Sequence, residues 1–178
     1  MISEKPIDSI AVCGFMGCGK STFGRTLADA LGFSFIDTDE MITAQAGHSI
    51  AQIFADRGEG GFRDMEHEII RQAALFRRCV ISTGGGAMTF ERNAKLLAQN
   101  ALIIHISRSF DGCYETVCMR QNRPIAGKKS REELLALYND RLPAYEKYAA
   151  HTFINDGPID EAAARFISWI LSSGLISV

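Results

Sequence analysis

Short runs rich in branched apolar residues recur along the chain and are bounded by turn-forming residues. Runs of this length are typical of buried β-strands. The predicted strands are Ile7–Cys13, Phe33–Ile36, Cys79–Ser82, Ala101–Ile106 and His151–Ile154.

Longer segments between these runs carry apolar residues every three or four positions, which is the period of an amphipathic helix. In Lys20–Leu31, for example, Phe23 and Leu27 share one face, and Gly32 ends the helix. The other predicted helices are Met41–Ala46, Ser49–Asp56, Phe62–Phe76, Arg92–Gln99, Ser109–Met119, Arg131–Ala149 and Ile159–Leu175. We expect a turn at Gly58–Gly61, an interruption of the helix near Pro143 and an exposed loop over Gln121–Lys129.

Strands that alternate with helices favour an α/β fold, in which helices cover both faces of a parallel sheet. Ligands of such sheets bind at the carboxyl ends of the strands. Polar or glycine-rich segments follow the first three predicted strands, at Gly14–Ser21, Asp37–Asp39 and Gly84–Gly86. We therefore expect these segments to meet at one edge of the sheet. No repeat or linker is visible, so residues 1–178 are expected to form one domain.

Length and charge narrow the function classes. A chain of 178 residues suits one compact core. The net charge of −2 argues against general binding to nucleic acid or to a membrane surface, because such binding relies on a large basic excess. No apolar run approaches the roughly 20 residues of a membrane helix. The five cysteines show no metal-binding spacing and indicate reduced thiols, so we expect a cytoplasmic protein.

The segment Gly14-Phe-Met-Gly-Cys-Gly-Lys-Ser21 fits the phosphate-loop pattern Gly-x-x-x-x-Gly-Lys-Ser/Thr and lies between a predicted strand and helix, as the pattern requires. Its glycines let backbone N–H groups point at phosphate oxygens, and the following helix adds its positive end. Lys20 can neutralise the β- and γ-phosphates, and Ser21 can bind Mg²⁺. The sequence therefore predicts binding of a nucleoside triphosphate. The Asn-Lys-x-Asp motif of common GTPases is absent, which favours a small-molecule kinase.

Charged residues after the second strand suggest an acceptor site. Asp37 and Asp39 can divide two roles, one near the metal and one on a substrate hydroxyl. Alternatively, one of them only caps a helix. Arg63 begins a predicted helix, and Glu66 three residues later can hold its guanidinium for a substrate carboxylate. A surface ion pair is the alternative.

Three further features can complete the site. The glycines Gly84–Gly86 allow close backbone approach to a ligand, unless they form a plain loop. Arg123, in the polar loop, can close over transferring phosphate, unless that loop is merely solvated. Arg141 can bring a second guanidinium to the acceptor.

Taken in order from about Ile10 to Trp169, these segments resemble the shikimate kinase family. The matching motifs are Gly-Phe-Met-Gly-x-Gly-Lys-Ser-Thr at Gly14–Thr22, Asp-x-Asp at Asp37–Asp39, Ser-Ile-x-x-Ile-Phe at Ser49–Phe54, Gly-Glu-x-x-Phe-Arg-x-x-Glu at Gly58–Glu66, Gly-Gly-Gly-Ala at Gly84–Ala87, Arg-Pro at Arg123–Pro124 and Arg-x-Pro-x-Tyr at Arg141–Tyr145.

The resemblance implies a three-layer α/β/α P-loop kinase fold with a five-stranded parallel sheet, a substrate-binding region over about 37–66 and a lid over about 115–129. It implies ATP-dependent phosphorylation of the shikimate 3-hydroxyl, on the route to chorismate and aromatic amino acids, by a protein that we expect to be a monomer. Catalytic roles would fall to Lys20, Asp37 and Arg123. ATP would be held by Gly17, Cys18, Gly19, Lys20, Ser21, Thr22 and Arg123, and Mg²⁺ by Ser21 and Asp37. Shikimate would be held by Asp39, Arg63, Gly84, Gly85, Gly86 and Arg141.

One departure from the family pattern concerns the nucleotide. Thr116 falls where the family commonly has an arginine that stacks on adenine, and Arg120 is a possible substitute. Two other functions stay open from the sequence alone. One is a nucleotide-binding regulatory relative without turnover, and the other is a kinase for another small hydroxy acid such as gluconate.

Overall fold

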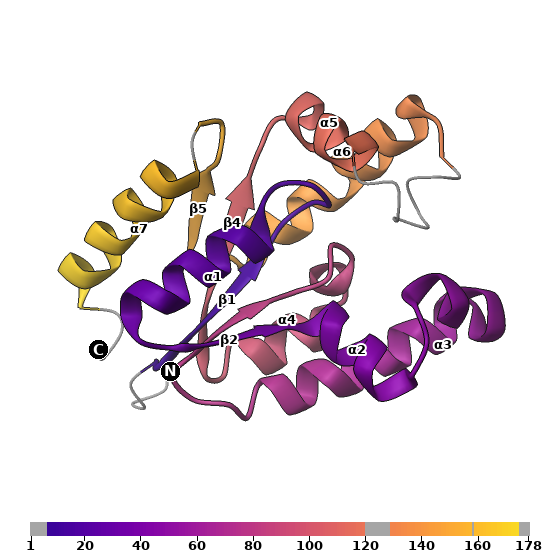
Figure 1. The fold of residues 1–178 in the computed structure, drawn as a ribbon, viewed down its shortest axis with the longest axis horizontal. Helices are drawn as coiled ribbons and strands as arrows, with labels where there is room; N and C mark the ends of the chain where they lie inside the picture. Colours follow the sequence, from indigo (N-terminus) through magenta and orange to yellow (C-terminus); the bar gives the residue numbers. More distant parts are fainter. Residues whose placement is uncertain (1–6, 120–128, 158, 175–178) are drawn as a thin grey trace.

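The computed structural model describes residues 7–119, 129–157 and 159–174. Within these ranges, five parallel strands form one sheet in the order β2-β3-β1-β4-β5 (Figure 1). The strands are β1 (Ser9–Cys13), β2 (Ser34–Asp37), β3 (Cys79–Ser82), β4 (Ala101–Ser107) and β5 (His151–Ile154). The α/β fold class and the five-stranded parallel sheet expected from the sequence are therefore confirmed.

The central strand β1 pairs with β3 on one side and with β4 on the other, so that Ile10 stands opposite both Val80 and Leu102. Every residue of β1 and β3 is buried. Strands covered by helices on both faces need apolar side chains at nearly every position, which is why short apolar runs predict them. Because the strands are parallel, the segments after β1, β2 and β3 leave the sheet at the same edge.

The helices lie in layers on both faces of this sheet. They are α1 (Lys20–Leu31), α2 (Thr38–Ala46), α3 (Ile50–Ala73), α4 (Glu91–Leu97), α5 (Phe110–Met119), α6 (Arg131–Tyr148) and α7 (Ile159–Ser173), with a short 3₁₀ helix η1 at Ala87–Thr89. The α1 helix packs against β3 and α7, whereas α4 and α6 contact β4. Figure 1 shows α1 and α7 in front of the sheet, with α2 and α3 projecting to one side.

The region between β2 and β3 differs from the prediction. The α2 helix begins at Thr38 rather than Met41, because Asp37 caps it: its Oδ1 accepts a hydrogen bond from the Asp39 N–H at 3.0 Å. The turn predicted over Gly58–Gly61 is wrong in extent, because only Gly58 leaves the helical conformation (φ 67°, ψ −177°) and α3 continues beyond it. The break predicted between two helices is therefore present, but it is confined to the kink at Gly58.

The interruption predicted near Pro143 is also wrong, because α6 runs through this residue. A proline inside a helix removes a backbone hydrogen bond and normally costs about 3 kcal/mol. Arg141 and Tyr145, on either side of it, are buried, and both donate hydrogen bonds to the carbonyl oxygen of Gly85. These tertiary contacts hold the helix together across the proline.

Two groups of buried apolar residues support the fold. The larger group fills the space between the sheet and its helices. A smaller one joins α2 to α3 and consists of Ile42, Ile53, Phe62 and Ile69. The α2–α3 projection therefore has its own small core, which holds the bent α3 helix against α2.

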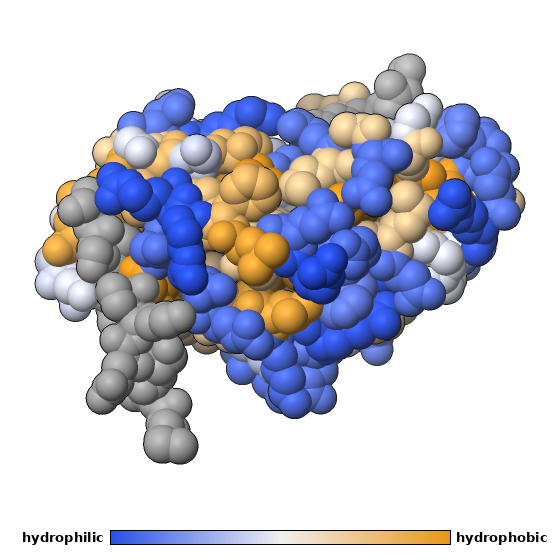
Figure 2. All heavy atoms as spheres, turned by 90° about the horizontal axis from the view of Figure 1, so that it is seen from below, coloured by the Kyte–Doolittle hydropathy of each residue, from blue (hydrophilic) through white to orange (hydrophobic). Residues whose placement is uncertain are grey.

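One face of the molecule shows how polar and apolar side chains share its surface. Figure 2 views the molecule from below and shows an apolar area near the centre bordered by hydrophilic side chains. The most exposed large apolar residues that the structure describes are Leu75, Phe76, Met119, Ile154 and Leu171. In the described ranges, every helix is too short or too polar to cross a lipid bilayer.

Candidate active site

The phosphate loop joins β1 to α1 at the carboxyl edge of the sheet. Gly17 and Gly19 have positive φ angles of 82° and 99°, a region that residues with a Cβ rarely adopt. Gly17 also lies against α5, because a Cβ on it would stand 2.4 Å from the carbonyl oxygen of Cys113. The glycines therefore allow both the curl of the loop and its close contact with α5.

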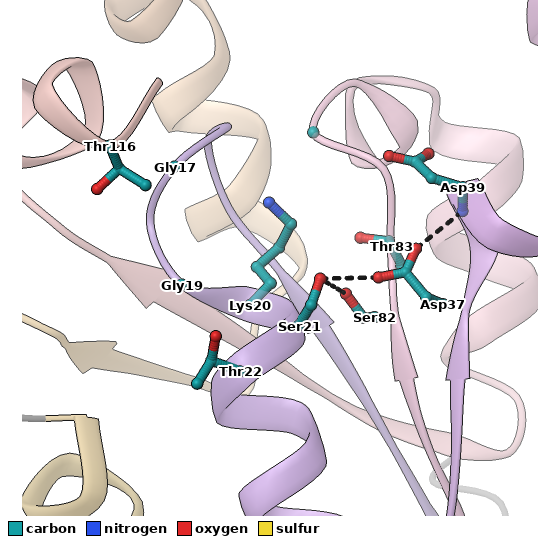
Figure 3. A pocket seen from close by; sticks show the side chains of 11 residues that line it. Gly17, Gly19, Lys20, Ser21, Thr22, Asp37, Asp39, Ser82, Thr83 and Thr116 are labelled. Atoms are coloured by element: carbon teal, nitrogen blue, oxygen red, sulfur yellow. Dashed lines mark hydrogen bonds between the residues drawn. The ribbon is translucent and has the colours of Figure 1, made fainter. Parts of the chain in front are cut away.

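Lys20 starts α1, and its side chain is buried inside the curl of the loop (Figure 3). Its Nζ donates hydrogen bonds to the carbonyl oxygens of Gly14 and Phe15, both at 3.0 Å. A positive charge is thus held where the phosphate-loop motif requires one. Phosphate oxygens entering the loop would compete with these two carbonyls for the ammonium.

Ser21 lies beside Asp37, as Figure 3 shows. Its Oγ donates to Asp37 Oδ2 at 2.8 Å and lies 3.4 Å from the Oγ of Ser82. Hydroxyl and carboxylate oxygens are hard ligands that suit Mg²⁺, which usually also keeps waters and substrate phosphates in its shell. No cluster of three or more His, Cys, Asp or Glu side chains suited to a metal occurs among the described residues. This donor set fits a magnesium ion shared with a nucleotide rather than one enclosed by protein alone.

One pocket joins these residues to the second aspartate. Figure 3 shows Thr116 and Gly17 at one end, Lys20 and Ser21 in the middle, and Asp37 and Asp39 at the other end. The residues that line it are Gly17, Gly19, Lys20, Ser21, Thr22, Asp37, Asp39, Ser82, Thr83, Gly85 and Thr116. The pocket therefore runs from α5, across the phosphate loop, to the start of α2.

Arg63 and Glu66 form a buried ion pair on α3, so the alternative of a surface pair is wrong. Arg63 Nη1 donates to Glu66 Oε2 at 2.8 Å, and Nη2 donates to Glu59 at 3.3 Å. Burial raises the pKa of Glu66, although the charge and hydrogen bond of Arg63 oppose this rise. Arg63 Nε and Glu66 Oε1 are buried and have no hydrogen-bond partner among the described residues. Such atoms usually require a water or ligand partner.

The three glycines after β3, Gly84–Gly86, form a glycine turn that brings the predicted acceptor residues together. A Cβ on Gly86 would stand 2.6 Å from Arg63 Nη2, and one on Gly84 would stand 2.7 Å from Asp39 Oδ1. Gly85 accepts a hydrogen bond from Arg141 Nη1 at 3.2 Å through its carbonyl oxygen. The turn thus works mainly by leaving space for these side chains. The N–H of Gly84 is already used, because it donates to Thr38 Oγ1 at 3.0 Å.

The turn also contacts the phosphate loop, because a Cβ on Gly85 would stand 3.4 Å from the backbone nitrogen of Met16. Asp39, Arg63 and Arg141 therefore surround a turn that touches the loop predicted to hold the donor. Donor and acceptor residues from five separate segments meet at one place.

Cys18 does not line the pocket: its side chain is buried, and its N–H donates to the carbonyl oxygen of Phe15 at 3.3 Å. Arg123, the possible substitute Arg120 and the greater part of the predicted lid lie outside the described residues. Their proposed roles remain predictions.

Sequence reasoning missed Thr38, Ser82 and Arg108. Thr38 fixes the glycine turn, and Ser82 lies beside Ser21. Arg108 Nη1 donates to the carbonyl oxygen of Gly17 at 3.1 Å and to Thr116 Oγ1 at 2.8 Å. Arg108 directly follows β4, so the rule that ligands bind beyond the carboxyl ends of strands could have identified it.

Comparison with known proteins agrees with this geometry. The family model described as "Shikimate kinase" matches residues 16–171. The chain belongs to the shikimate kinase family. A shikimate kinase of Moorella thermoacetica is 35% identical over 96% of this chain and 98% of its own, and one of Thermodesulfovibrio yellowstonii is 38% identical over 78% of this chain and 81% of its own.

Solved structures of the shikimate kinase family also share the fold. The structure described as shikimate kinase from Acinetobacter baumannii in complex with shikimate superposes with a TM-score of 0.89 at 31% identity, covering 94% of each chain. Shikimate kinase from Aquifex aeolicus gives a TM-score of 0.82 at 29% identity over 95% of this chain and 99% of its own. The family expected from the ordered motifs is therefore confirmed.

Proposed function

We propose that this protein transfers the γ-phosphoryl group of ATP to the 3-hydroxyl of shikimate. The observation that carries the proposal is the contact between the glycine turn and the phosphate loop. Asp39, Arg63 and Arg141 all contact this turn, and the loop carries Lys20 and Ser21. Membership of the shikimate kinase family supports the same conclusion. Phosphoryl transfer needs positioning and charge neutralisation more than covalent help from the protein, and these residues supply both.

On the acceptor side, the charges match the substrate. Shikimate carries one carboxylate and three hydroxyls. The buried guanidinium of Arg63, held by Glu66, and that of Arg141, held on the Gly85 carbonyl, suit the carboxylate. Asp39 is an acceptor for hydroxyl donors. Because Arg63 is fixed before the substrate arrives, little side-chain entropy is lost on binding.

On the donor side, Lys20 neutralises charge on the β- and γ-phosphates, and the loop N–H groups bind the phosphate oxygens. Ser21 and Asp37 provide oxygen ligands for Mg²⁺. When bound, the metal would screen the negative charge of the phosphates during the transfer. Asp37 also lies next to Asp39 and orients the start of α2, so it links the metal site to the acceptor.

Other parts of the assignment stay predictions. We propose that residues 37–66 form the acceptor region of one domain and that residues 115–129 form a lid, from which Arg123 reaches the transferring phosphate. A cytoplasmic monomer is the expected form of the protein.

A coupled assay tests the reaction directly. We expect Mg²⁺-dependent ADP release from ATP that requires shikimate. ADP release with gluconate but not shikimate would contradict the proposal, and so would tight ATP binding without turnover on shikimate.

The substitution Arg63→Ala tests the acceptor site. It should weaken shikimate binding by at least about tenfold, because a charge-assisted hydrogen bond of roughly 1.5–3 kcal/mol is lost. ATP affinity should stay unchanged in calorimetric titrations. Since the change leaves Glu66 buried without its partner, the double variant Arg63→Ala with Glu66→Gln provides a version without the isolated charge.

Arg71→Ala is the matched control, because Arg71 lies on the same helix and forms an exposed ion pair with Glu68 at the same spacing. It should leave shikimate affinity at the wild-type value. An unchanged shikimate affinity in both Arg63 variants would contradict the assignment.

A further inference from the structure

The two ends of the pocket have different neighbours, and this fixes the direction of a bound nucleotide. The acceptor residues Asp39 and Arg63 lie beyond the Asp37 end. The γ-phosphate of a donor must point toward the acceptor, so its nucleoside must lie at the opposite end, beside Gly17 and Thr116 (Figure 3). This step rests on the proposed function, because it uses the position of the acceptor.

Arg108 does not itself line the pocket, but it contacts two residues that form this end of it. Its Nη1 donates to the Gly17 carbonyl oxygen at 3.1 Å and to Thr116 Oγ1 at 2.8 Å, and both of these residues line the pocket. No described residue accepts a hydrogen bond from its Nε or Nη2. The residue is half-buried, so part of it remains accessible to solvent.

Contacts with neighbouring residues fix the position of Arg108. A Cβ on Gly112 would stand 2.7 Å from Arg108 Nε and 3.2 Å from Cζ, so the guanidinium rests where α5 has no side chain. The carbonyl oxygen of Arg108 accepts a hydrogen bond from the Tyr138 hydroxyl at 2.9 Å, and the next N–H, of Ser109, donates to Asp156 at 3.2 Å. Both the backbone and the side chain of Arg108 are therefore held.

We propose that Arg108 is a nucleoside-binding residue of this protein, whose guanidinium forms a wall of the nucleobase site. A planar cation held at this end can stack on the face of a purine base. The phosphate loop grips the triphosphate of any ligand, whereas Arg108 distinguishes a nucleotide from a bare polyphosphate. Arg108 lies between β4 and α5 and contacts Thr116 of α5, so the proposed base site lies next to the helix that leads toward the predicted lid.

Calorimetric titrations without shikimate test this proposal, with MgATP and magnesium tripolyphosphate as the two probes. Arg108→Ala should weaken MgATP binding by about tenfold, the size expected for a stacked guanidinium. Tripolyphosphate, which has no base, should bind with wild-type affinity. Arg131→Ala is the matched control, because Arg131 forms an ion pair with Asp111 of α5 and makes no hydrogen bond to a pocket-lining residue among the described residues, and it should change neither affinity.

Two further variants make the outcome decisive. Arg108→Gln keeps a donor for the Gly17 carbonyl but lacks the charged plane, and it is used if Arg108→Ala does not fold. Adding Thr116→Arg to Arg108→Ala should restore part of the ATP affinity, since residue 116 lines the same end of the pocket.

An equal loss of affinity for ATP and tripolyphosphate would overturn the proposal and assign Arg108 to the shape of the phosphate loop. Unchanged ATP affinity would overturn it as well. These measurements require no acceptor, so a failure of the Arg108 proposal can be distinguished from a failure of the proposed reaction with shikimate.

Discussion

At the level of single residues, the glycine turn after β3 matters because its residues have no side chains and leave space for Arg63 and Asp39. A methyl group on Gly86 would stand 2.6 to 2.9 Å from the guanidinium of Arg63. The backbone of Gly86 is in an ordinary helical conformation, with φ −105°, so an alanine there causes no strain of its own. Gly86→Ala should therefore displace Arg63 without disturbing the turn.

We expect Gly86→Ala to raise the KM for shikimate by about tenfold or more, since a displacement of this size misaligns a charge-assisted contact. The KM for ATP should stay near the wild-type value. Steady-state kinetics with each substrate varied in turn provides the measurement. Equal increases in both KM values would show that the change had disturbed the phosphate loop, contrary to this prediction.

The site residues that could be predicted from the sequence are those whose position depends on a short continuous motif. Lys20 and Ser21 belong to a continuous motif, so their positions in the pocket follow from a few neighbouring residues. Arg63 could be identified only as one half of a pair, and its burial depends on α2 and the glycine turn. Arg108 carries no motif at all. Its contacts with Gly17 and Thr116 arise from the packing of α5 on the phosphate loop, which the sequence does not reveal.

At the level of elements, the bend in α3 decides where Arg63 lies. Gly58 has φ 67° and ψ −177°, a conformation that is essentially restricted to glycine, although a Cβ there would meet no atom within 4 Å. Gly58→Ala should therefore destabilise the protein by about 1–3 kcal/mol through backbone strain alone. Chemical denaturation followed by circular dichroism measures this loss.

Gly60→Ala is the control for Gly58→Ala. Gly60 lies two residues further along α3, a Cβ there would also meet open space, and its φ is not positive. Alanine in a helix is favoured over glycine by about 1 kcal/mol, so this variant should be as stable as the wild type or slightly more so. Equal destabilisation by both changes would refute the role given to the bend.

The elements were predicted best where a single local cause determines them. The core strands are apolar runs because helices bury both faces of the sheet, and α1 ends at Gly32, which adopts a left-handed conformation. The errors occur where distant contacts decide. The α6 helix continues past Pro143 because Arg141 and Tyr145 are anchored on Gly85, more than fifty residues earlier. Sequence patterns within one segment do not contain that information.

At the level of the whole molecule, the site lies where two packed units meet. The main core supports the phosphate loop, and the small α2–α3 core supports Arg63. The strand order, which no local pattern predicted, places β3 between β1 and β2. The segments that follow these three strands are therefore neighbours, and the glycine turn after β3 lies between the phosphate loop and the two aspartates.

Beneath this site, the buried His105 links the stability of the molecule to pH. Burial, assisted by the nearby charge of Lys20, lowers the pKa of His105 from 6.5 to about 4. In the unfolded chain His105 is protonated below about pH 6.5, whereas in the folded protein it is protonated only below about pH 4. The contribution of His105 to stability is present above pH 6.5 and is lost as the pH falls through this range. A shift of this size corresponds to at most about 3 kcal/mol.

The free energy of unfolding should thus fall between pH 7 and pH 4.5, and His105→Phe should reduce that fall. Phenylalanine keeps a ring beside Tyr145, which lies 5.3 Å from His105 between ring centroids, but it takes up no proton. The raised pKa of Glu66 acts in the opposite direction, because its stabilising effect is lost as the pH rises. Comparing variant with wild type at each pH cancels this contribution. Urea denaturation at both pH values measures the difference, and His48→Ala, at an exposed position, is the control. An identical fall in stability for wild type and His105→Phe would show that protonation of His105 does not limit the acid stability of this fold.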